Sequence, residues 1–222
     1  IAGVLLLPTG YFYRTFMNFL AHTYLSGCSE EVIVGNFMGD YVKGRNYLHL
    51  PEKVRKGIMI HRDIDSYTDS HSITRQSRLR LVEKYHKYSG VIVDIFYDHF
   101  LASLWDDYCN IPLEEYISNA YGLLKRNYKT LPTGIKVWFP TFLENNWMLA
   151  YRTVEGIELV LDRMSANTSL PDHTLFAVEK LRGEYDGFQG DFQRFLPQII
   201  DFIEKKYLID IKVQMDRKGK DC

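Results

Sequence analysis

The sequence has few of the features that mark disulfide-rich, membrane-spanning or nucleic-acid-binding proteins. Its 222 residues include only Cys28, Cys109 and Cys222, which are widely spaced and outside any C-x-x-C pattern. We therefore expect neither a disulfide framework nor a zinc ribbon, and a cytoplasmic location fits this cysteine usage. No apolar run approaches the roughly 18 to 20 residues of a membrane span. With 27 Lys/Arg against 28 Asp/Glu, the chain also lacks the basic surplus of a general nucleic-acid binder.

Several familiar motifs are absent as well. The sequence contains no G-x-G-x-x-G turn, no P-loop, no G-x-S-x-G elbow and no internal repeat, and runs of alternating polar and apolar residues are few. Helical periodicity dominates instead, which predicts an all-α fold. Hydrophobic residues make up 46% of the chain, enough for one domain with a substantial core.

The start of the chain needs separate treatment. The apolar run at 4–7 is broken by Pro8 and Gly10 and has no basic segment before it, so it makes a poor signal peptide. Met17 opens a well-patterned segment. We expect residues 1–16 to be an N-terminal extension outside the fold, 17–207 a single helical domain, and 208–222 a polar tail.

The stretch Gly57–His71, G-I-M-I-H-R-D-I-D-S-Y-T-D-S-H, combines an apolar helical pattern with ionisable side chains. In a helix running from Pro51 to about Asp69, the side chains of His61, Asp65 and Asp69 fall at i, i+4 and i+8 on one stripe. Carboxylates and a neutral imidazole suit Mn²⁺, Mg²⁺, Fe²⁺ or Zn²⁺. The alternative is a solvated face on which Arg62 pairs with Asp65 or Asp69.

Three further segments carry polar residues within apolar patterns. His22 lies in the short apolar helix expected at 17–25, and Asp40 lies in G-N-F-M-G-D-Y-V-K-G, near the end of a helix expected from about Ser29 to Val42. Glycines at 35 and 39 predict close packing on another backbone or a ligand, because glycine costs helix propensity. The helix expected at 91–108 is apolar nearly all round, so it should be buried. It nevertheless carries Asp94, Asp98 and His99, which are costly to bury unless neutralised or bound.

Charge is uneven along the chain. Between Lys43 and Lys87 there are eleven Lys/Arg and five Asp/Glu, a net of about +6, against about −7 elsewhere. A basic amphipathic helix expected at 72–88 belongs to this segment, which could receive an acidic partner or simply face water. The residues proposed to meet such a partner are Arg75, Arg78, Arg80 and Lys84.

The second half suggests further amphipathic helices, among them 135–150, interrupted at Pro140, and 188–207. We expect the aromatic residues of this half to pack in the hydrophobic core.

Four ordered blocks together resemble the acyl carrier protein phosphodiesterase family: M-N-F-L-A-H at 17–22, G-N-F-M-G-D-Y-V-K-G at 35–44, G-I-M-I-H-R-D-I-D-S-Y-T-D at 57–69 and D-I-F-Y-D-H-F-L-A-S-L-W at 94–105. The resemblance covers Met17 to about Tyr207. It implies a helical bundle related to the HD-domain phosphohydrolases and a divalent-metal activity, with Mn²⁺ preferred and Mg²⁺ or Fe²⁺ as alternatives. It also implies hydrolysis of the phosphodiester between a carrier-protein serine and 4′-phosphopantetheine.

The family's motifs map onto His22, Asp40, His61, Asp65, Asp69, Asp98 and His99, although HD enzymes carry the adjacent pair in the opposite order from Asp98-His99. We expect His22, Asp40, His61 and Asp98 to be metal ligands, with Asp65 or His99 completing the shell. Asp40 or Asp69 would accept a proton from the attacking water, and Arg62 would hold a phosphate oxygen or pair with Asp65. The partner would be acyl carrier protein.

Two other functions fit the same residues. One is an HD-like phosphohydrolase acting on a nucleotide or another small phosphodiester. The other is a non-catalytic helical binding module in which the histidines and aspartates form structural ion pairs.

Overall fold

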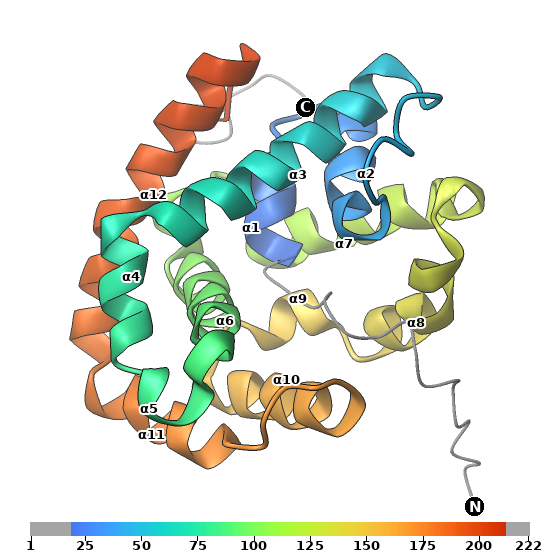
Figure 1. The fold of residues 1–222 in the computed structure, drawn as a ribbon. Helices are drawn as coiled ribbons and strands as arrows, with labels where there is room; N and C mark the ends of the chain where they lie inside the picture. The colour runs from blue at the N-terminus through green and yellow to red at the C-terminus, as the bar shows by residue number, and fades with distance from the viewer. Residues whose placement is uncertain (1–18, 212–222) are drawn as a thin grey trace, which may run out of the picture.

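The computed structural model describes residues 19–211, and within that range every regular element is a helix (Figure 1). The all-α prediction is therefore confirmed. The α-helices are α1 (Phe19–Tyr24), α2 (Glu30–Phe37), α3 (Glu52–Ser70), α4 (Ser72–Leu79), α5 (Val82–Tyr85), α6 (Ser89–Ser103), α7 (Leu113–Arg126), α8 (Thr133–Glu144), α9 (Trp147–Ala150), α10 (Val154–Asn167), α11 (Thr174–Gly183) and α12 (Tyr185–Tyr207). Short 3-10 helices are η1 (Gly39–Tyr41), η2 (His86–Tyr88), η3 (Trp105–Asp107) and η4 (Tyr128–Thr130).

Helices α2 and α3 cross with their backbones in close contact. A Cβ atom on Gly35 would lie 2.1 Å from the carbonyl oxygen of Val54, and one on Gly57 would lie 2.1 Å from that of Val32. No larger residue fits at either position without moving a helix. The prediction that Gly35 packs on another backbone is confirmed, and this crossing brings the end of α2 next to the middle of α3.

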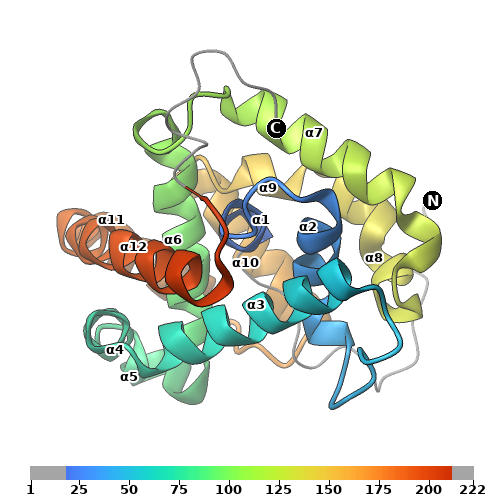
Figure 2. The same cartoon turned by 90° about the horizontal axis from the view of Figure 1, so that it is seen from above.

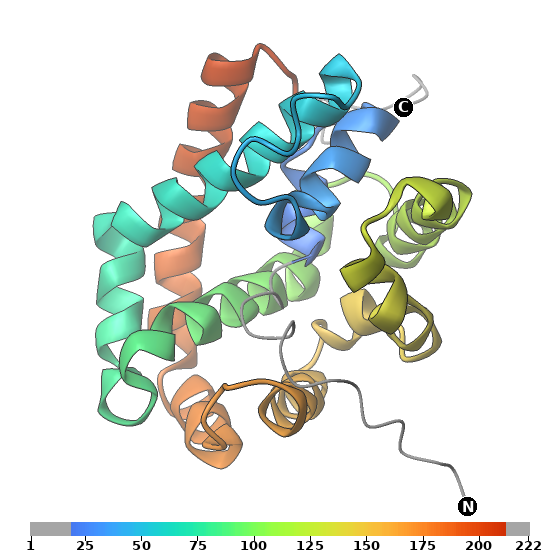
Figure 3. The same cartoon turned by 45° about the vertical axis from the view of Figure 1, so that its right-hand side comes forward.

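The buried helix α6 lies at the centre of the bundle, and α1, α4, α10 and α12 pack around it (Figure 3). Most of its side chains are buried, including both Asp98 and His99, as its nearly uniform apolar sequence predicts. The long helix α12 runs beside both α6 and α3 (Figure 2). Together these contacts hold α1 and α3 against the core.

A buried carboxylate ties α12 to α4. Asp191, 1% exposed, accepts hydrogen bonds from Ser77 Oγ at 2.8 Å and from Arg80 Nη1 at 2.6 Å, and Arg194 Nη2 donates to its other oxygen. Because a buried charge is costly without partners, these donors make the carboxylate tolerable in the core.

Two predicted helix boundaries are wrong. Helix α2 ends at Phe37 rather than at Val42, and the chain continues into η1. Gly39 in η1 packs so closely against His61 that a Cβ atom at position 39 would clash with its side chain. The basic segment 72–88 is divided among α4, α5 and η2 rather than forming one helix. His86 has a φ of 46°, which an uninterrupted α-helix does not allow.

The predicted break at Pro140 is also wrong. Pro140 lies inside α8, so the helix continues despite the hydrogen bond that proline cannot make. The interruption comes at Asn146, whose φ of 45° is left-handed and which separates α8 from α9. Asparagine tolerates this conformation better than most residues.

Two observations concern membrane-spanning helices and the ends of the chain. No helix among the described residues combines the length and the apolar character needed to cross a bilayer. The extension predicted at 1–16 and most of the tail predicted at 208–222 lie outside the described residues, whereas Ile211 is fully buried.

Candidate metal centre

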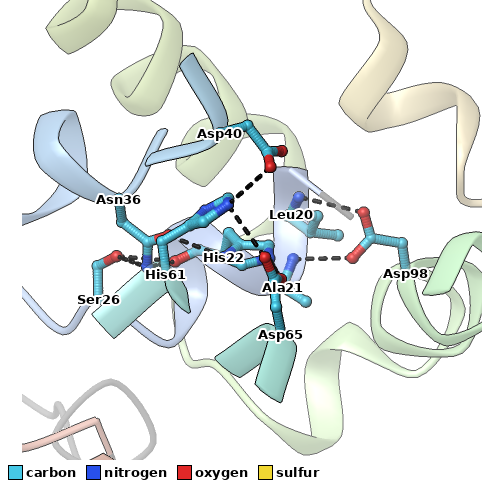
Figure 4. Close-up of polar contacts among 9 residues, drawn as sticks. All are labelled: Leu20, Ala21, His22, Ser26, Asn36, Asp40, His61, Asp65 and Asp98. Carbon is cyan, nitrogen blue, oxygen red and sulfur yellow. Dashed lines mark hydrogen bonds and ion pairs between the residues drawn. The ribbon is translucent and has the colours of Figure 1, made fainter. Parts of the chain in front are cut away.

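The short helix α1 carries the buried imidazole of His22 (Figure 4). Six residues are too few for a stable helix alone, so its position depends on its surroundings. Asp98 of α6 accepts hydrogen bonds from the backbone N–H groups of Leu20 at 3.2 Å and Ala21 at 2.8 Å. A carboxylate at this end satisfies amide donors that have no partner within the helix. Asp98 thus holds α1 in place with both of its oxygens.

Helix α3 carries His61 and Asp65 one turn apart, on the side that faces α1. His61 is buried and its Nε2 lies 3.3 Å from Asp65 Oδ2, while His22 Nε2 lies 3.3 Å from Asp65 Oδ1. The two imidazole rings are stacked with centroids 4.2 Å apart. Asp65 is about half exposed, so its carboxylate lies between the two buried imidazoles and the solvent.

Asp40, in η1, approaches the same group from the other side. Its Oδ1 lies 3.4 Å from His61 Nε2. The loop that follows is held by Arg62, whose Nη2 donates to the carbonyl oxygens of Val42 at 2.7 Å and Gly44 at 3.0 Å. The Arg62 guanidinium also stacks over the Tyr47 ring at 4.9 Å. In this structure Arg62 therefore braces the loop after Asp40.

The donor atoms fit a divalent cation. One ligand atom each from His22, His61 and Asp65 can be chosen so that all lie within 4.8 Å of one another. Within the described part of the chain, the buried Nε2 atoms of His22 and His61 make no hydrogen bond, although carboxylate oxygens lie 3.3 to 3.4 Å away. Two imidazole nitrogens and a carboxylate are suitable ligands for Mn²⁺, Fe²⁺ or Zn²⁺, so these residues could hold a metal ion.

Burial and neighbouring charges shift the pKa values of His22 and Asp65 in opposite directions. Burial lowers the pKa of His22, but Asp65, Asn36 and Asp40 raise it, and the net pKa is raised. Burial raises the pKa of Asp65, but His22 and His61 lower it, and the net pKa is lowered. A cation at this position would compete with protonation of His22, because a metal binds the neutral imidazole.

The structure separates the other predicted site residues from this group. The Asp98 carboxylate is directed at the start of α1 (Figure 4). The imidazole of His99 bonds to the carbonyl oxygen of Tyr151 at 2.8 Å and the hydroxyl of Tyr185 at 3.0 Å. Asp69 is 75% exposed and pairs with Arg78 at 3.3 Å. Their catalytic or ligand roles stay predictions.

The predicted partner-binding cations also differ in their surroundings. Arg80 is 25% exposed and pairs with Asp191 and with Glu184. Arg78 is engaged by Asp69. Arg75 is exposed, and Lys84 is about half exposed with its Nζ 3.9 Å from Glu83. Arg75 and Lys84 are the two most accessible of the four.

One residue that contacts both imidazoles was not predicted from the sequence. Asn36, fully buried at the end of α2, lies 2.8 Å from His22 Nδ1 and 3.2 Å from His61 Nδ1 through its Oδ1. The signal was an asparagine within an otherwise apolar helical segment, between glycines that bring α2 onto α3.

These elements define an all-helical protein with a candidate His/Asp metal centre. Residues 17–199 match the family model described as acyl carrier protein phosphodiesterase. The chain therefore belongs to the acyl carrier protein phosphodiesterase family, and its resemblance to that family is confirmed.

Curated relatives with the same description support this assignment. The chain is 28% identical to the acyl carrier protein phosphodiesterase of Klebsiella pneumoniae (strain 342) and 27% identical to that of Pectobacterium atrosepticum, in each case over 193 residues covering 86% of this chain and 100% of the relative. The corresponding protein of Salmonella agona is 26% identical over the same shares. No solved structure gave a significant match.

Proposed function

We propose that this protein hydrolyses the phosphodiester that joins 4′-phosphopantetheine to a serine of holo-acyl carrier protein, releasing the apo-protein. The observation that carries the proposal is the convergence of His22, His61 and Asp65, within 4.8 Å through their ligand atoms, in a chain of this family. Mn²⁺ is the proposed cofactor, with Mg²⁺ or Fe²⁺ as alternatives.

The proposed ligands are the Nε2 atoms of His22 and His61 and the carboxylate of Asp65. A divalent cation bound there would neutralise a nonbridging phosphate oxygen and lower the pKa of a water molecule. The position of Asp40, whose Oδ1 lies 3.4 Å from His61 Nε2, supports a role for this carboxylate beside the metal. We propose Asp40 as the acceptor of the water's proton in preference to Asp69, which is exposed and paired with Arg78.

We propose that Asp98 and Arg62 act through other residues. Asp98 holds α1, and with it His22, by accepting the two N–H bonds at the start of that helix. Arg62 holds the loop after Asp40 through the Val42 and Gly44 carbonyls. Both therefore position the site without having to touch the phosphate.

The acidic carrier protein would dock on the basic segment Lys43–Lys87. Arg75 and Lys84 are its proposed contacts, because they are the more accessible of the cations. Complementary charge mainly speeds encounter and fixes orientation. Arg80, held by a buried carboxylate, contributes to the stability of the fold instead.

The test is intact-mass analysis of purified holo-acyl carrier protein incubated with this protein and Mn²⁺. We expect metal-dependent loss of the phosphopantetheine mass, abolished by EDTA and reduced at least about a hundredfold in rate by Asp40→Ala, as for loss of a general base. Asp69→Ala serves as the matched control and should retain activity.

Other outcomes would point elsewhere. Hydrolysis of small diesters with no action on holo-acyl carrier protein would favour a small-molecule phosphohydrolase. No hydrolysis and less than about 0.2 equivalents of bound Mn²⁺, where a site should approach one, would favour the non-catalytic binding module.

A further inference from the structure

The amide of Asn36 has only one orientation compatible with its neighbours. One of its two terminal atoms lies 2.9 Å from the carbonyl oxygen of His22, which can only accept a hydrogen bond, so that atom must be the Nδ2 donor. The same Nδ2 lies 2.8 Å from Ser26 Oγ. The Ser26 hydroxyl donates its own hydrogen to the His22 carbonyl oxygen at 2.7 Å. Ser26 Oγ therefore accepts the hydrogen bond from Asn36 Nδ2.

The remaining atom, Asn36 Oδ1, is therefore an acceptor for both imidazoles. It lies 2.8 Å from His22 Nδ1 and 3.2 Å from His61 Nδ1 (Figure 4). An amide oxygen has two lone pairs and no proton to give. Both Nδ1 atoms must then carry hydrogen, and in the neutral rings both Nε2 atoms present lone pairs. Because Asn36 is fully buried, water does not readily replace these bonds.

The hydrogen bonds to Asn36 Oδ1 favour the opposite tautomer from the one that the nearby carboxylates of Asp65 and Asp40 favour. Asp65 lies 3.3 Å from both Nε2 atoms and Asp40 lies 3.4 Å from that of His61. Alone, these acceptors would draw the single proton of each neutral imidazole to Nε2, the atom that must be free to bind a cation. A hydrogen bond to the opposite nitrogen of a ligating histidine selects the tautomer and orients the ring.

We propose that Asn36 is a positioning residue of the metal centre, and that its single amide oxygen sets the Nδ1–H tautomer of both His22 and His61. The inference rests on the proposed metal-binding role of the two histidines. It concerns this chain's own hydrogen bonds, however, so it can be tested in the metal-free protein and without acyl carrier protein.

The first measurement is two-dimensional ¹⁵N–¹H NMR of the histidine side chains in metal-free protein, at a pH above their titration. We expect His22 and His61 both in the Nδ1–H form. The Nε2–H form at either residue would overturn the proposal without any variant. The wild-type protein suffices, so this outcome does not depend on whether a substituted protein folds.

The second measurement compares Asn36→Leu, of similar size, with Ser26→Ala, which removes a partner of Asn36 but leaves both Nδ1 contacts. We expect Asn36→Leu to move the imidazoles towards Nε2–H and to weaken Mn²⁺ binding about 10- to 100-fold, measured by electron paramagnetic resonance of free Mn²⁺. Ser26→Ala should keep the Nδ1–H forms and bind Mn²⁺ within about threefold of wild type. Asn36→Asp, which keeps an acceptor oxygen, should keep the Nδ1–H forms.

Folded Asn36→Leu with unchanged tautomers and Mn²⁺ affinity would overturn the proposal, as would an equal loss of affinity in Ser26→Ala. A wild-type protein that binds no Mn²⁺ would instead count against the proposed function, and the tautomers would still decide the role of Asn36.

Discussion

At the scale of single residues, Gly39, the residue before Asp40, is constrained by a side chain of the site itself. A Cβ atom there would lie 2.3 Å from His61 Cγ and 2.6 Å from its Cβ. The imidazole of His61 thus occupies the space that any side chain at 39 would need. The absence of a side chain at this position is part of the site's geometry.

We therefore predict that Gly39→Ala displaces His61 and lowers Mn²⁺ affinity and activity by at least about tenfold, the lower end of what supporting contacts at metal sites contribute. Isothermal titration with Mn²⁺ and the holo-acyl carrier protein assay measure both effects. Gly190→Ala is the control, because a Cβ at that position meets nothing within 4 Å and should not disturb the site. Unchanged affinity in Gly39→Ala would show that the imidazole can move without loss.

Asp94, one helical turn before Asp98, gives a prediction about pH. Burial raises the pKa of Asp94 well above its ordinary value, and the charges of Asp65, Asp69 and Asp98 raise it further, against a lowering by Arg78. The folded state therefore binds a proton more tightly than the unfolded state does. The free energy of unfolding falls as pH rises from the unfolded pKa of about 3.9 towards the folded pKa.

The substitution Asp94→Asn removes the titrating carboxyl group, and with it this fall in the free energy of unfolding. In metal-free protein we expect the variant to be more stable than wild type at pH 8, with the difference shrinking as the pH approaches 4. Urea denaturation in EDTA at pH 5 and pH 8 measures it. A stability difference that does not depend on pH would mean that Asp94 titrates alike in the folded and unfolded chain.

At the scale of elements, the short helix α1 depends on α6 through Asp98. Burial raises the pKa of Asp98 well above its ordinary value, while the N–H groups of Ala21 and Leu20 lower it. Both carboxylate oxygens are used, at 2.8 and 3.2 Å. An amide at this position would point an NH₂ group at one of the two backbone donors.

We predict that Asp98→Asn destabilises the protein by about 1–3 kcal/mol, the cost of leaving a buried donor unsatisfied. Urea denaturation at pH 7 measures this loss, and the exposed Asp106→Asn is the matched control with an expected change within about 0.5 kcal/mol. Metal affinity should fall with the loss of α1 contacts. Full stability combined with lost affinity would instead favour Asp98 as a ligand, the role that the family resemblance implies.

At the scale of the whole molecule, charge asymmetry bears on recognition of the substrate. The double substitution Arg75→Glu and Lys84→Glu should raise the KM for holo-acyl carrier protein by about tenfold at low salt, because rim charges govern encounter. Hydrolysis of a small phosphodiester should be unchanged. Steady-state kinetics on both substrates measures the difference, with Lys125→Glu on α7 as control. Equal losses of activity on both substrates would contradict the proposal that these residues form a docking surface.

The sequence predicted those parts of the site that lie within one helix. His61 and Asp65 are four residues apart, and helical geometry alone puts them on the same side. The same spacing also suggested Asp69, two turns after His61. The Asp69 side chain, however, is exposed and pairs with Arg78. Asp98 and His99 are adjacent in the chain, yet one turns to α1 and the other to Tyr151 and Tyr185, because successive helical residues point about 100° apart.

What the sequence by itself determined is the helical class, the buried character of α6, the close approach of glycine-bearing helices and the family, since these follow from periodicity, composition and ordered motif blocks. The tertiary structure alone decided which polar residues meet. His22, Asn36, Asp40 and His61 come from four separate elements, and their distances depend on the α2–α3 crossing at Gly35 and Gly57. Local propensity acts over a few residues, whereas this crossing is set by packing among distant helices.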